Sequence, residues 1–245
     1  ATALEMSAYA DERGFDGIEL QEHHSCEDGY LPRPFLMGCA IAARTERLHI
    51  TLAAVLLPLD DPVAVAEQIA VADLVSGGRI NVVLGAGYAG QDLAAFGVPP
   101  GERARRMDEG FEIVTRALTG ERFTWNGRPI CVRPLPMSRP PRLFGGGGAP
   151  AAARRAARFG LGFYPFYEDA IADYEAECRR LGREPGPTMR LPTNIHVYED
   201  PEEGWAEIGE NLLYYVRSYA AFAGSLETPM RGIEDVATLR ASGQV

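Results

Sequence analysis

The sequence has few cysteines, no cluster of basic residues and no long apolar run. Its 4 cysteines form no Cys-x-x-Cys pair and are too sparse for a disulfide scaffold, which fits a reducing cytoplasm. The net charge is −10 and no run of Lys or Arg exceeds two residues, so the chain lacks the charge needed to bind a nucleic-acid backbone. The most apolar stretch, Leu48–Leu59, is shorter than the roughly 18 residues of a membrane span. We therefore expect a cytoplasmic protein without a nucleic-acid or membrane partner.

Apolar periodicity predicts strands that alternate with helices. Six short apolar runs are typical of strands: Gly17–Leu20, Leu48–Leu56, Ile80–Leu84, Arg142–Phe144, Leu161–Tyr164 and Leu191–Tyr198. Helical spacing predicts helices over Leu4–Arg13, Pro34–Arg44, Val63–Val75, Glu102–Leu118, Pro150–Phe159, Ala170–Leu181, Pro201–Ala223 and Ile233–Arg240. A small excursion with a tight Asn126-Gly127 turn covers residues 123–137. The alternation predicts an α/β fold with a parallel sheet and helices outside it.

The chain also lacks an initiator methionine and a signal peptide. It begins at Ala1 within one helical pattern and stops at Val245 directly after another, so we expect it to be incomplete at both ends. One strand lost from each end would complete the eight strands of a (β/α)8 TIM barrel, which uses about 200–250 residues as one domain. We therefore expect a single barrel domain over residues 1–245. A doubly wound open sheet is the structural alternative.

Two adjacent histidines, His23 and His24, follow the first predicted strand. Side chains alternate along an extended segment, so we expect one of the two rings to face the mouth of a barrel. An imidazole there could act as a general acid or base, because it exchanges protons near neutral pH. A solvated loop pair is the alternative. We expect no metal site, because His49 and His196 have no cysteine or carboxylate cluster at ligand spacing.

Small residues end the next two predicted strands. Ala53, Ala54 and Val55 would let a flat ring lie against the backbone, although core packing explains them equally well. The third strand ends in another unhindered backbone, formed by Gly85, Ala86, Gly87 and Tyr88. This Gly-x-Gly lacks the third glycine and the later acidic residue of a dinucleotide fingerprint, which argues against a Rossmann fold.

Four consecutive glycines, Gly145–Gly148, lead into a helix that begins at Pro150. They place unhindered N–H groups at a helix N-terminus, which carries about half a positive charge. The pattern predicts a cradle for a phosphate, and a flexible turn without a ligand is the alternative. At least one of Arg103, Arg105 and Arg106 could point inward to pair with that phosphate.

Taken in order, these segments resemble the bacterial luciferase-like flavin monooxygenase family. The resemblance rests on residues 14–24, 53–63, 73–79 and 85–88, on Phe96-Gly97, on the Arg105/Glu109 pair, and on Gly145–Gly148 followed by residues 156–160. It covers about residues 3–165. In the remaining third of the chain, only the alternation of helices and strands matches the family.

The resemblance implies a (β/α)8 barrel with reduced FMN, or the related deazaflavin coenzyme F420, bound at the C-terminal ends of the strands. It implies that His23 is the catalytic histidine, with His24 beside it, and that the bond between Ala53 and Ala54 is a cis peptide that supports the flavin ring. The cofactor-binding residues that it implies are Ala53, Ala54, Val55, Gly85, Ala86, Gly87, Tyr88, Arg105, Gly147, Gly148 and Ala149.

Two departures from the family limit what the resemblance implies. The luciferases place an acidic and a hydroxyl residue where this chain has Gly148 and Ala149, and a reactive cysteine where it has Gly85. Light emission is therefore not implied. The loop before the fourth strand is short and rich in proline, so analogy does not identify the substrate.

We expect a flavin-dependent monooxygenase that takes reduced FMN from a separate flavin reductase and uses oxygen on a small organic substrate. The alternatives are a hydride-transferring enzyme that uses F420, a non-catalytic flavin-binding paralogue, and a phosphosugar isomerase barrel with Glu22 as its base. The resemblance also implies a homodimer through the helices that follow the early strands. The small residues of 38–43 would allow close approach of such helices.

Overall fold

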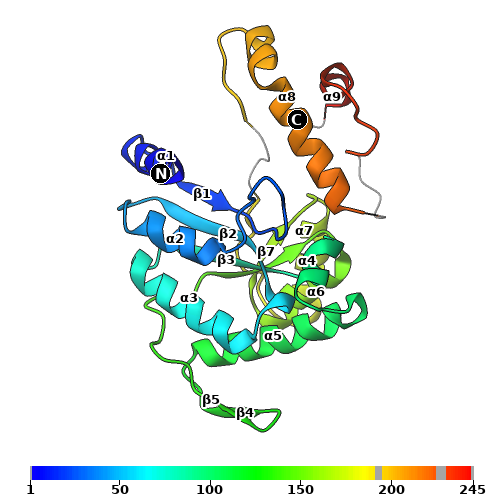
Figure 1. Cartoon of the computed structure of the whole chain (residues 1–245). Helices are drawn as coiled ribbons and strands as arrows, with labels where there is room; N and C mark the ends of the chain where they lie inside the picture. Colours follow the sequence, from blue (N-terminus) through cyan, green and yellow to red (C-terminus); the bar gives the residue numbers. More distant parts are fainter. Residues whose placement is uncertain (1, 191–194, 225–229, 244–245) are drawn as a thin grey trace. The chain divides into compact units, whose positions relative to one another are not determined.

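The computed structural model describes residues 2–190, 195–224 and 230–243. These residues form two compact units, one with the described residues up to 87 and 92–190, the other with 88–91 and the described residues after 190. Figure 1 follows the elements along the chain. The first unit contains the parallel sheet.

The sheet of the first unit has five parallel strands: β1 (Gly17–Leu20), β2 (His49–Leu56), β3 (Ile80–Gly85), β6 (Leu143–Gly147) and β7 (Gly162–Pro165). Their spatial order, β1-β2-β3-β6-β7, follows the chain without a reversal. A doubly wound sheet reverses its order at a switch point, whereas a barrel does not. The order of the strands is therefore that of a barrel, and the alternative of a doubly wound open sheet is wrong.

Helices connect the strands as the alternation predicts. They are α1 (Thr2–Glu12), α2 (Pro34–Ala42), α3 (Pro62–Ser76), α4 (Gly90–Ala95), α5 (Arg103–Leu118), α6 (Pro150–Phe159) and α7 (Ala170–Arg180), with short 3-10 turns at η1 (Leu57–Leu59) and η2 (Pro100–Glu102). The proline-rich excursion is a hairpin of β4 (Phe123–Trp125) and β5 (Arg128–Ile130), and both turn residues, Asn126 and Gly127, have positive φ. The tight turn is confirmed.

The ends of α3 show why these helices begin and end where they do. The Asp61 side chain accepts a hydrogen bond from the Val63 N–H at 2.9 Å, and proline occupies the first turn. Gly77 ends the helix in the left-handed conformation, φ +66°, which glycine adopts without a steric penalty. Each of these signals is local, so the helix bounds follow closely from the sequence.

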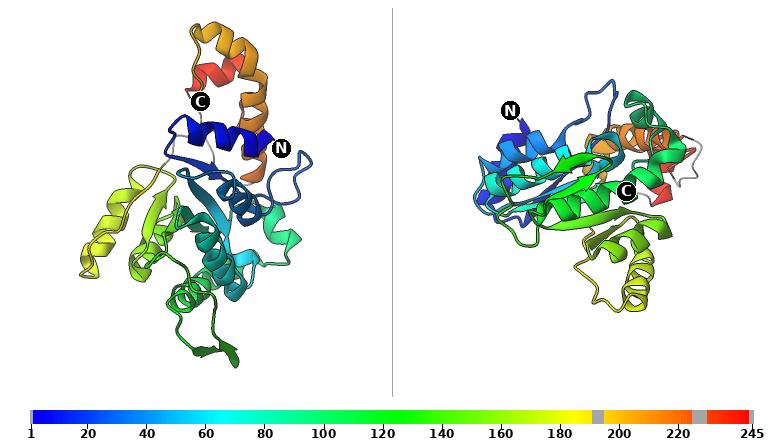
Figure 2. Two further views of the ribbon diagram at one scale, coloured as in Figure 1. Left: turned by 90° about the vertical axis from the view of Figure 1, so that its left-hand side faces the viewer. Right: turned by 90° about the horizontal axis from the view of Figure 1, so that it is seen from below.

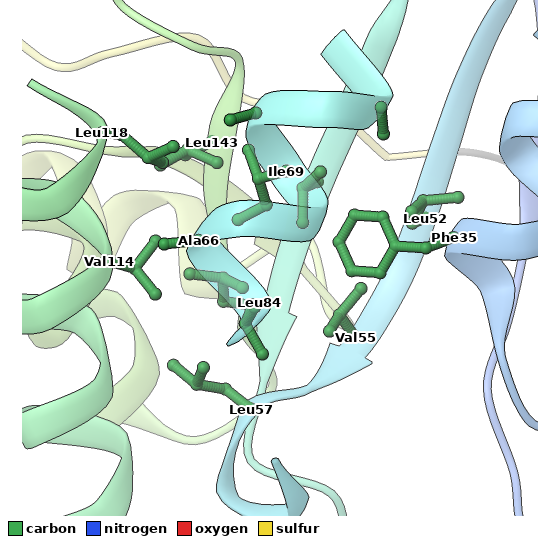
Figure 3. Close-up of a cluster of buried hydrophobic side chains, with 14 of the residues drawn as sticks. Phe35, Leu52, Val55, Leu57, Ala66, Ile69, Leu84, Val114, Leu118 and Leu143 are labelled. Carbon is green, nitrogen blue, oxygen red and sulfur yellow. The ribbon is translucent and has the colours of Figure 1, made fainter. Parts of the chain in front are cut away.

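The main core lies between the sheet and the helices α2, α3 and α5, which cover one of its faces (Figures 1 and 2). Figure 3 shows how side chains from these elements meet: Phe35, Leu52, Val55, Leu57, Ala66, Ile69, Leu84, Val114, Leu118 and Leu143. All of β3 is buried, as expected of a strand covered on both faces.

Gly38 in α2 also faces this core. A Cβ added there would lie 3.2 Å from the Leu52 Cδ2 and 3.5 Å from the Ile80 Cδ1. The small residue therefore lets α2 approach the sheet. Gly38 itself is buried, and packing against the sheet accounts for its small size.

A hydrogen bond joins the two outermost strands of the sheet. The Tyr164 hydroxyl on β7 donates to the Glu19 carboxylate on β1 at 2.6 Å. Strands at opposite edges can be this close only if the sheet curls round, as it does in a barrel. Inside the curl, Thr51 lies in register between Glu19 and Asn81, and the Asn81 amide donates to the Thr51 hydroxyl at 3.1 Å.

The second unit contains the helices α8 (Pro201–Phe222) and α9 (Val236–Ser242). They share a small core of Leu212, Leu213, Val216, Ile233 and Leu239. Across the described ranges of the chain, no helix has the length and apolar character needed to cross a membrane.

The sixth predicted strand, Leu191–Tyr198, is not formed where the structure describes it. Residues 191–194 lie outside the described residues, and 195–198 have no strand structure. Ile195 and Val197, whose alternation suggested a strand, are 70% and 89% exposed. The chain instead runs beside β7 slightly earlier, through a bridge between Phe163 and Thr188.

Candidate active site

The candidate site lies at the C-terminal edge of the sheet. Parallel strands end at the same edge, and the register confirms this, because Leu56 is opposite Gly85 and Leu84 is opposite Gly145. The segments that this edge brings together are 22–24, 53–56, 85–87 and 145–149. Tyr88, which the resemblance places with them, belongs to the second compact unit.

His23 is buried and paired with a carboxylate that is distant in sequence. Its Nδ1 lies 2.9 Å from the Asp92 Oδ2, and the other Asp92 oxygen accepts the His24 backbone N–H at 2.9 Å. Asp92 is 1% exposed and His23 is 5% exposed. A carboxylate only accepts hydrogen bonds, so the Nδ1 that faces it carries a proton.

His24 is also buried, against a different carboxylate. Its Nε2 lies 2.8 Å from the Glu22 Oε1, and the second Glu22 oxygen accepts the Leu56 backbone N–H at 3.1 Å. Burial raises the pKa of Glu22, and the hydrogen bonds from His24 and Leu56 offset part of this shift. The pairing joins the loop after β1 to the end of β2. The alternative of a solvated histidine pair is therefore wrong.

At the C-terminal ends of β2 and β3, beside these histidines, the side chains are small or absent and do not cover the backbone. The Ala53–Ala54 peptide bond is cis, as the resemblance implies. A Cβ added to Gly85 would lie 2.6 Å from the Ala54 Cβ, so glycine is required for the two strands to approach. Ala53, Ala54 and Ala86 are partly accessible, whereas the Val55 side chain packs into the core and leaves only its backbone for a ligand.

The four glycines belong mostly to a strand. β6 continues through Gly147, and a Cβ at Gly145 would lie 2.8 Å from the Ala156 Cβ in α6. A Cβ at Gly146 would lie 2.5 Å from a Val83 methyl carbon. Close packing thus explains these two glycines, and the flexible-turn alternative does not hold for them. Gly148 and Ala149 remain before α6, whose first residue is Pro150.

The three arginines at the start of α5 have partners within the protein. Arg105 points along the exposed side of α5, where its guanidinium donates to both Glu109 oxygens at 2.9 and 3.0 Å and to Glu102 at 3.2 Å. Glu102 and Glu109 lie three and four residues from Arg105 in sequence, and this spacing brings side chains together on the surface of a helix. The structure therefore does not bring Arg105 to Gly147–Ala149. Arg103 donates to the Gly87 carbonyl at 2.9 Å, and Arg106 donates to the Pro58 carbonyl at 3.3 Å.

Sequence reasoning missed the role of Asp92. Nothing local indicates that it pairs with His23, because the two residues are 69 positions apart and α4, which carries Asp92, is only six residues long. Sequence reasoning also missed the polar residues on the inner face of the curved sheet. Glu19 and Tyr164 are far apart in sequence and come together only because the first and last strands of the sheet approach each other. No group of His, Cys, Asp and Glu within the described residues is suited to hold a metal ion.

The chain belongs to the luciferase-like monooxygenase family, whose model matches residues 1–241. It is 26% identical over 254 residues to limonene 1,2-monooxygenase of Rhodococcus erythropolis, covering 95% of this chain and 66% of that protein. The chain thus spans slightly less than two thirds of that relative. The monooxygenase RslO1 from Streptomyces bottropensis has a similar structure, with a TM-score of 0.82 and 28% identity over 90% of this chain and 72% of that one.

Two more distant structures share the fold. The oxygenating constituent of 3,6-diketocamphane monooxygenase from Pseudomonas putida, in complex with FMN, has a TM-score of 0.74 at 17% identity and covers 94% of this chain and 76% of its own. An F420-dependent secondary alcohol dehydrogenase, in complex with an F420-acetone adduct, has a TM-score of 0.75 at 19% identity, covering 98% and 79%. Structural neighbours with this barrel therefore bind either FMN or F420.

Proposed function

We propose that this chain is the barrel portion of a flavin-dependent monooxygenase that uses reduced FMN and oxygen on a small organic substrate. The observation that carries the proposal is the buried His23–Asp92 pair beside the bare backbone of Ala53, Ala54 and Gly85. The similarity to limonene 1,2-monooxygenase and RslO1 supports the oxygen-using branch of the family.

The residues at the strand ends fit a flavin. Ala53 and Ala54 leave a partly accessible surface without bulky side chains on which a planar ring system could lie, and Ala86 and Gly87 extend it. Gly147, Gly148 and Ala149, at the start of α6, would bind the phosphate through backbone N–H groups. When bound, reduced FMN supplies the electrons for activation of oxygen.

The residues of the protein would bind and orient the flavin and the substrate, and they would transfer a proton. Asp92 fixes the orientation of the His23 ring and its Nδ1 proton, and we assign to this ring the role of accepting or returning a proton at the substrate or the flavin. His24 and Glu22 tie the loop to β2 and so hold His23 in place. The apolar residues around this edge, including Leu56 and Leu93, exclude water from it.

The second candidate is hydride transfer with F420, in which His23 would donate a proton to the substrate. The shared fold of the F420-dependent alcohol dehydrogenase favours it. We further propose that the protein is cytoplasmic, forms a homodimer and receives reduced flavin from a separate reductase.

Anaerobic titration with reduced FMN and, separately, reduced F420, followed by admission of air, distinguishes the two candidates. We expect tight binding of reduced FMN and reoxidation on exposure to air. Binding of F420 alone, without reaction with oxygen, would replace the monooxygenase by the hydride-transfer enzyme. His23→Ala should bind reduced FMN as the parent does but slow its reoxidation about 100-fold or more. Binding of neither coenzyme would refute both functions.

A further inference from the structure

Arg103, the first residue of α5, is a partly buried cation that forms no ion pair with any residue that the structure describes. One of its guanidinium N–H groups donates to the Gly87 carbonyl at 2.9 Å. The neighbouring carboxylate, Glu102, accepts instead from Arg105 and Arg106. Because a guanidinium has five N–H donors, Arg103 keeps donors for a further partner, and its charge favours an anion.

The strand register places this guanidinium close to the loop of residues 147–149. Leu84 on β3 is opposite Gly145 on β6, so the two strands are neighbours. Gly87 and Gly148 each follow three residues later, where the chain leaves the C-terminal edge of the sheet. Neighbouring strands lie about 4.8 Å apart. The guanidinium that donates to the Gly87 carbonyl therefore lies next to the segment that leads into α6.

The packing of α5 against α6 gives the same placement independently. The Arg155 side chain of α6 donates to the Asp108 carboxylate of α5 at 2.9 Å. Each of these residues lies five positions after the first residue of its helix, Pro150 or Arg103. Both helices return from the same edge of a parallel sheet and so run in the same direction, with a rise of about 1.5 Å per residue. The two helices therefore begin at the same level, with Arg103 beside the N-terminus of α6.

Arg105, which the resemblance implies for the phosphate, has different surroundings. Its guanidinium donates to both Glu109 oxygens and to Glu102, and its side chain is 57% exposed. Pairing Arg105 with a phosphate would require these bonds to break. Arg103 has no carboxylate to release, so a phosphate beside it would add charge-assisted hydrogen bonds without replacing others.

We propose that Arg103 binds the phosphate of the flavin together with the backbone N–H groups of Gly147–Ala149. This role rests on the proposed function. The loop has no polar side chain of its own, so Arg103 supplies the charged donor that the loop lacks. A guanidinium can pair with a phosphate through two parallel N–H···O bonds. The alternative is a structural role, in which Arg103 only fixes the Gly87 carbonyl.

Riboflavin, which has the ring and ribityl chain of FMN but no phosphate, separates these two roles. Reduced FMN and reduced riboflavin are titrated anaerobically into the parent, Arg103→Gln and Arg103→Lys. We expect Arg103→Gln to weaken the binding of reduced FMN about tenfold to 100-fold and that of reduced riboflavin less than about twofold. The riboflavin titration also verifies that the variant is folded. Arg103→Lys keeps the charge without the planar pair of donors and should recover only part of the FMN affinity.

Two further variants complete the comparison. Arg122→Gln, at an exposed position outside the candidate site, removes the same charge and is the matched control. Arg105→Gln tests the arginine that the resemblance implies. A loss of affinity for reduced FMN in Arg105→Gln but not in Arg103→Gln would overturn the proposal.

The remaining outcomes also distinguish the two roles. A loss that is equal for reduced FMN and reduced riboflavin would leave Arg103 with a structural role and overturn the proposal. If the parent binds reduced riboflavin as tightly as reduced FMN, the site does not recognise the phosphate, and the role of Arg103 fails while the flavin function stands. Binding of neither flavin by the parent would refute the proposed function, and the role of Arg103 with it.

Discussion

Asp92 holds two consecutive residues of the loop after β1 at this edge of the sheet. One oxygen faces the His23 Nδ1 and the other accepts the His24 N–H, each at 2.9 Å. Asp92→Asn keeps the size but turns an amide N–H₂ toward Nδ1, which forces the imidazole into the other tautomer. We expect the reoxidation of bound FMN to slow about 100-fold with little change in flavin affinity. Glu27→Gln, exposed in the same loop, is the control, and equal rates in both variants would contradict the pairing.

Gly85 is the residue at which β2 and β3 approach closely beside the candidate site. In Gly85→Ala the new methyl would lie 2.6 Å from the Ala54 Cβ, and the backbone of both strands would have to separate. We expect unfolding free energy to fall by about 1–3 kcal/mol and the affinity for reduced FMN to fall with it. Urea denaturation and flavin titration measure the two effects. Gly101→Ala, where an added Cβ contacts nothing within 4 Å, should change neither.

The strands β1 and β7 are joined by the partly buried Glu19 carboxylate, and this makes their stability depend on pH. Burial raises the pKa of Glu19 in the folded protein above its value in the unfolded chain. The contribution of this carboxyl is therefore fully present at pH values below the unfolded pKa and is lost as pH rises through the folded pKa. We expect the parent to lose stability relative to Glu19→Gln as the pH rises from the ordinary glutamate pKa, about 4.3, through the raised pKa of the folded protein, as measured by urea denaturation. A difference that does not vary with pH would contradict the burial of this charge.

Elements whose signals are local could be predicted from the sequence, and those that depend on tertiary contacts could not. The residues of β1 and α6 match the predicted ranges, because apolar spacing, Pro150 and Gly160 mark their bounds. β6 is longer than predicted, since glycine disfavours strands in general, but here it lets α6 and β3 pack closely. The short helix α4 was missed although it carries Asp92, because six residues are too few for a periodic pattern.

At the scale of the candidate site, the sequence indicated which strand ends matter but not which side chains pair. His23, His24 and the cis Ala53–Ala54 bond follow from the resemblance to the family, and the structure places all of them at one edge. The resemblance implies that Arg105 pairs with the phosphate, whereas its partners in the structure are its helical neighbours Glu102 and Glu109, a local pairing that the resemblance did not indicate. The carboxylate partners of the histidines include one from a distant segment, Asp92, which a single sequence does not connect.

At the scale of the whole molecule, we place the interface of the proposed homodimer at the exposed apolar side chains of α2 and α3. Leu36, Val71, Leu74 and Val75 are 74%, 44%, 42% and 48% exposed, and they lie on helices that pack against each other after β1 and β2. Large apolar side chains exposed on neighbouring helices favour burial in an interface. A double variant, Leu36→Glu with Val71→Glu, should therefore convert a homodimer into a monomer of unchanged fold.

Light scattering at micromolar concentration, with circular dichroism to verify the fold, measures this change. Ala104→Glu, on an exposed position of α5, adds charge outside the patch and should leave the dimer intact. A parent protein that is already monomeric would refute the homodimer. A double variant that remains dimeric would instead move the interface away from α2 and α3, because two buried carboxylates facing their symmetry mates would cost more than such an interface could offset.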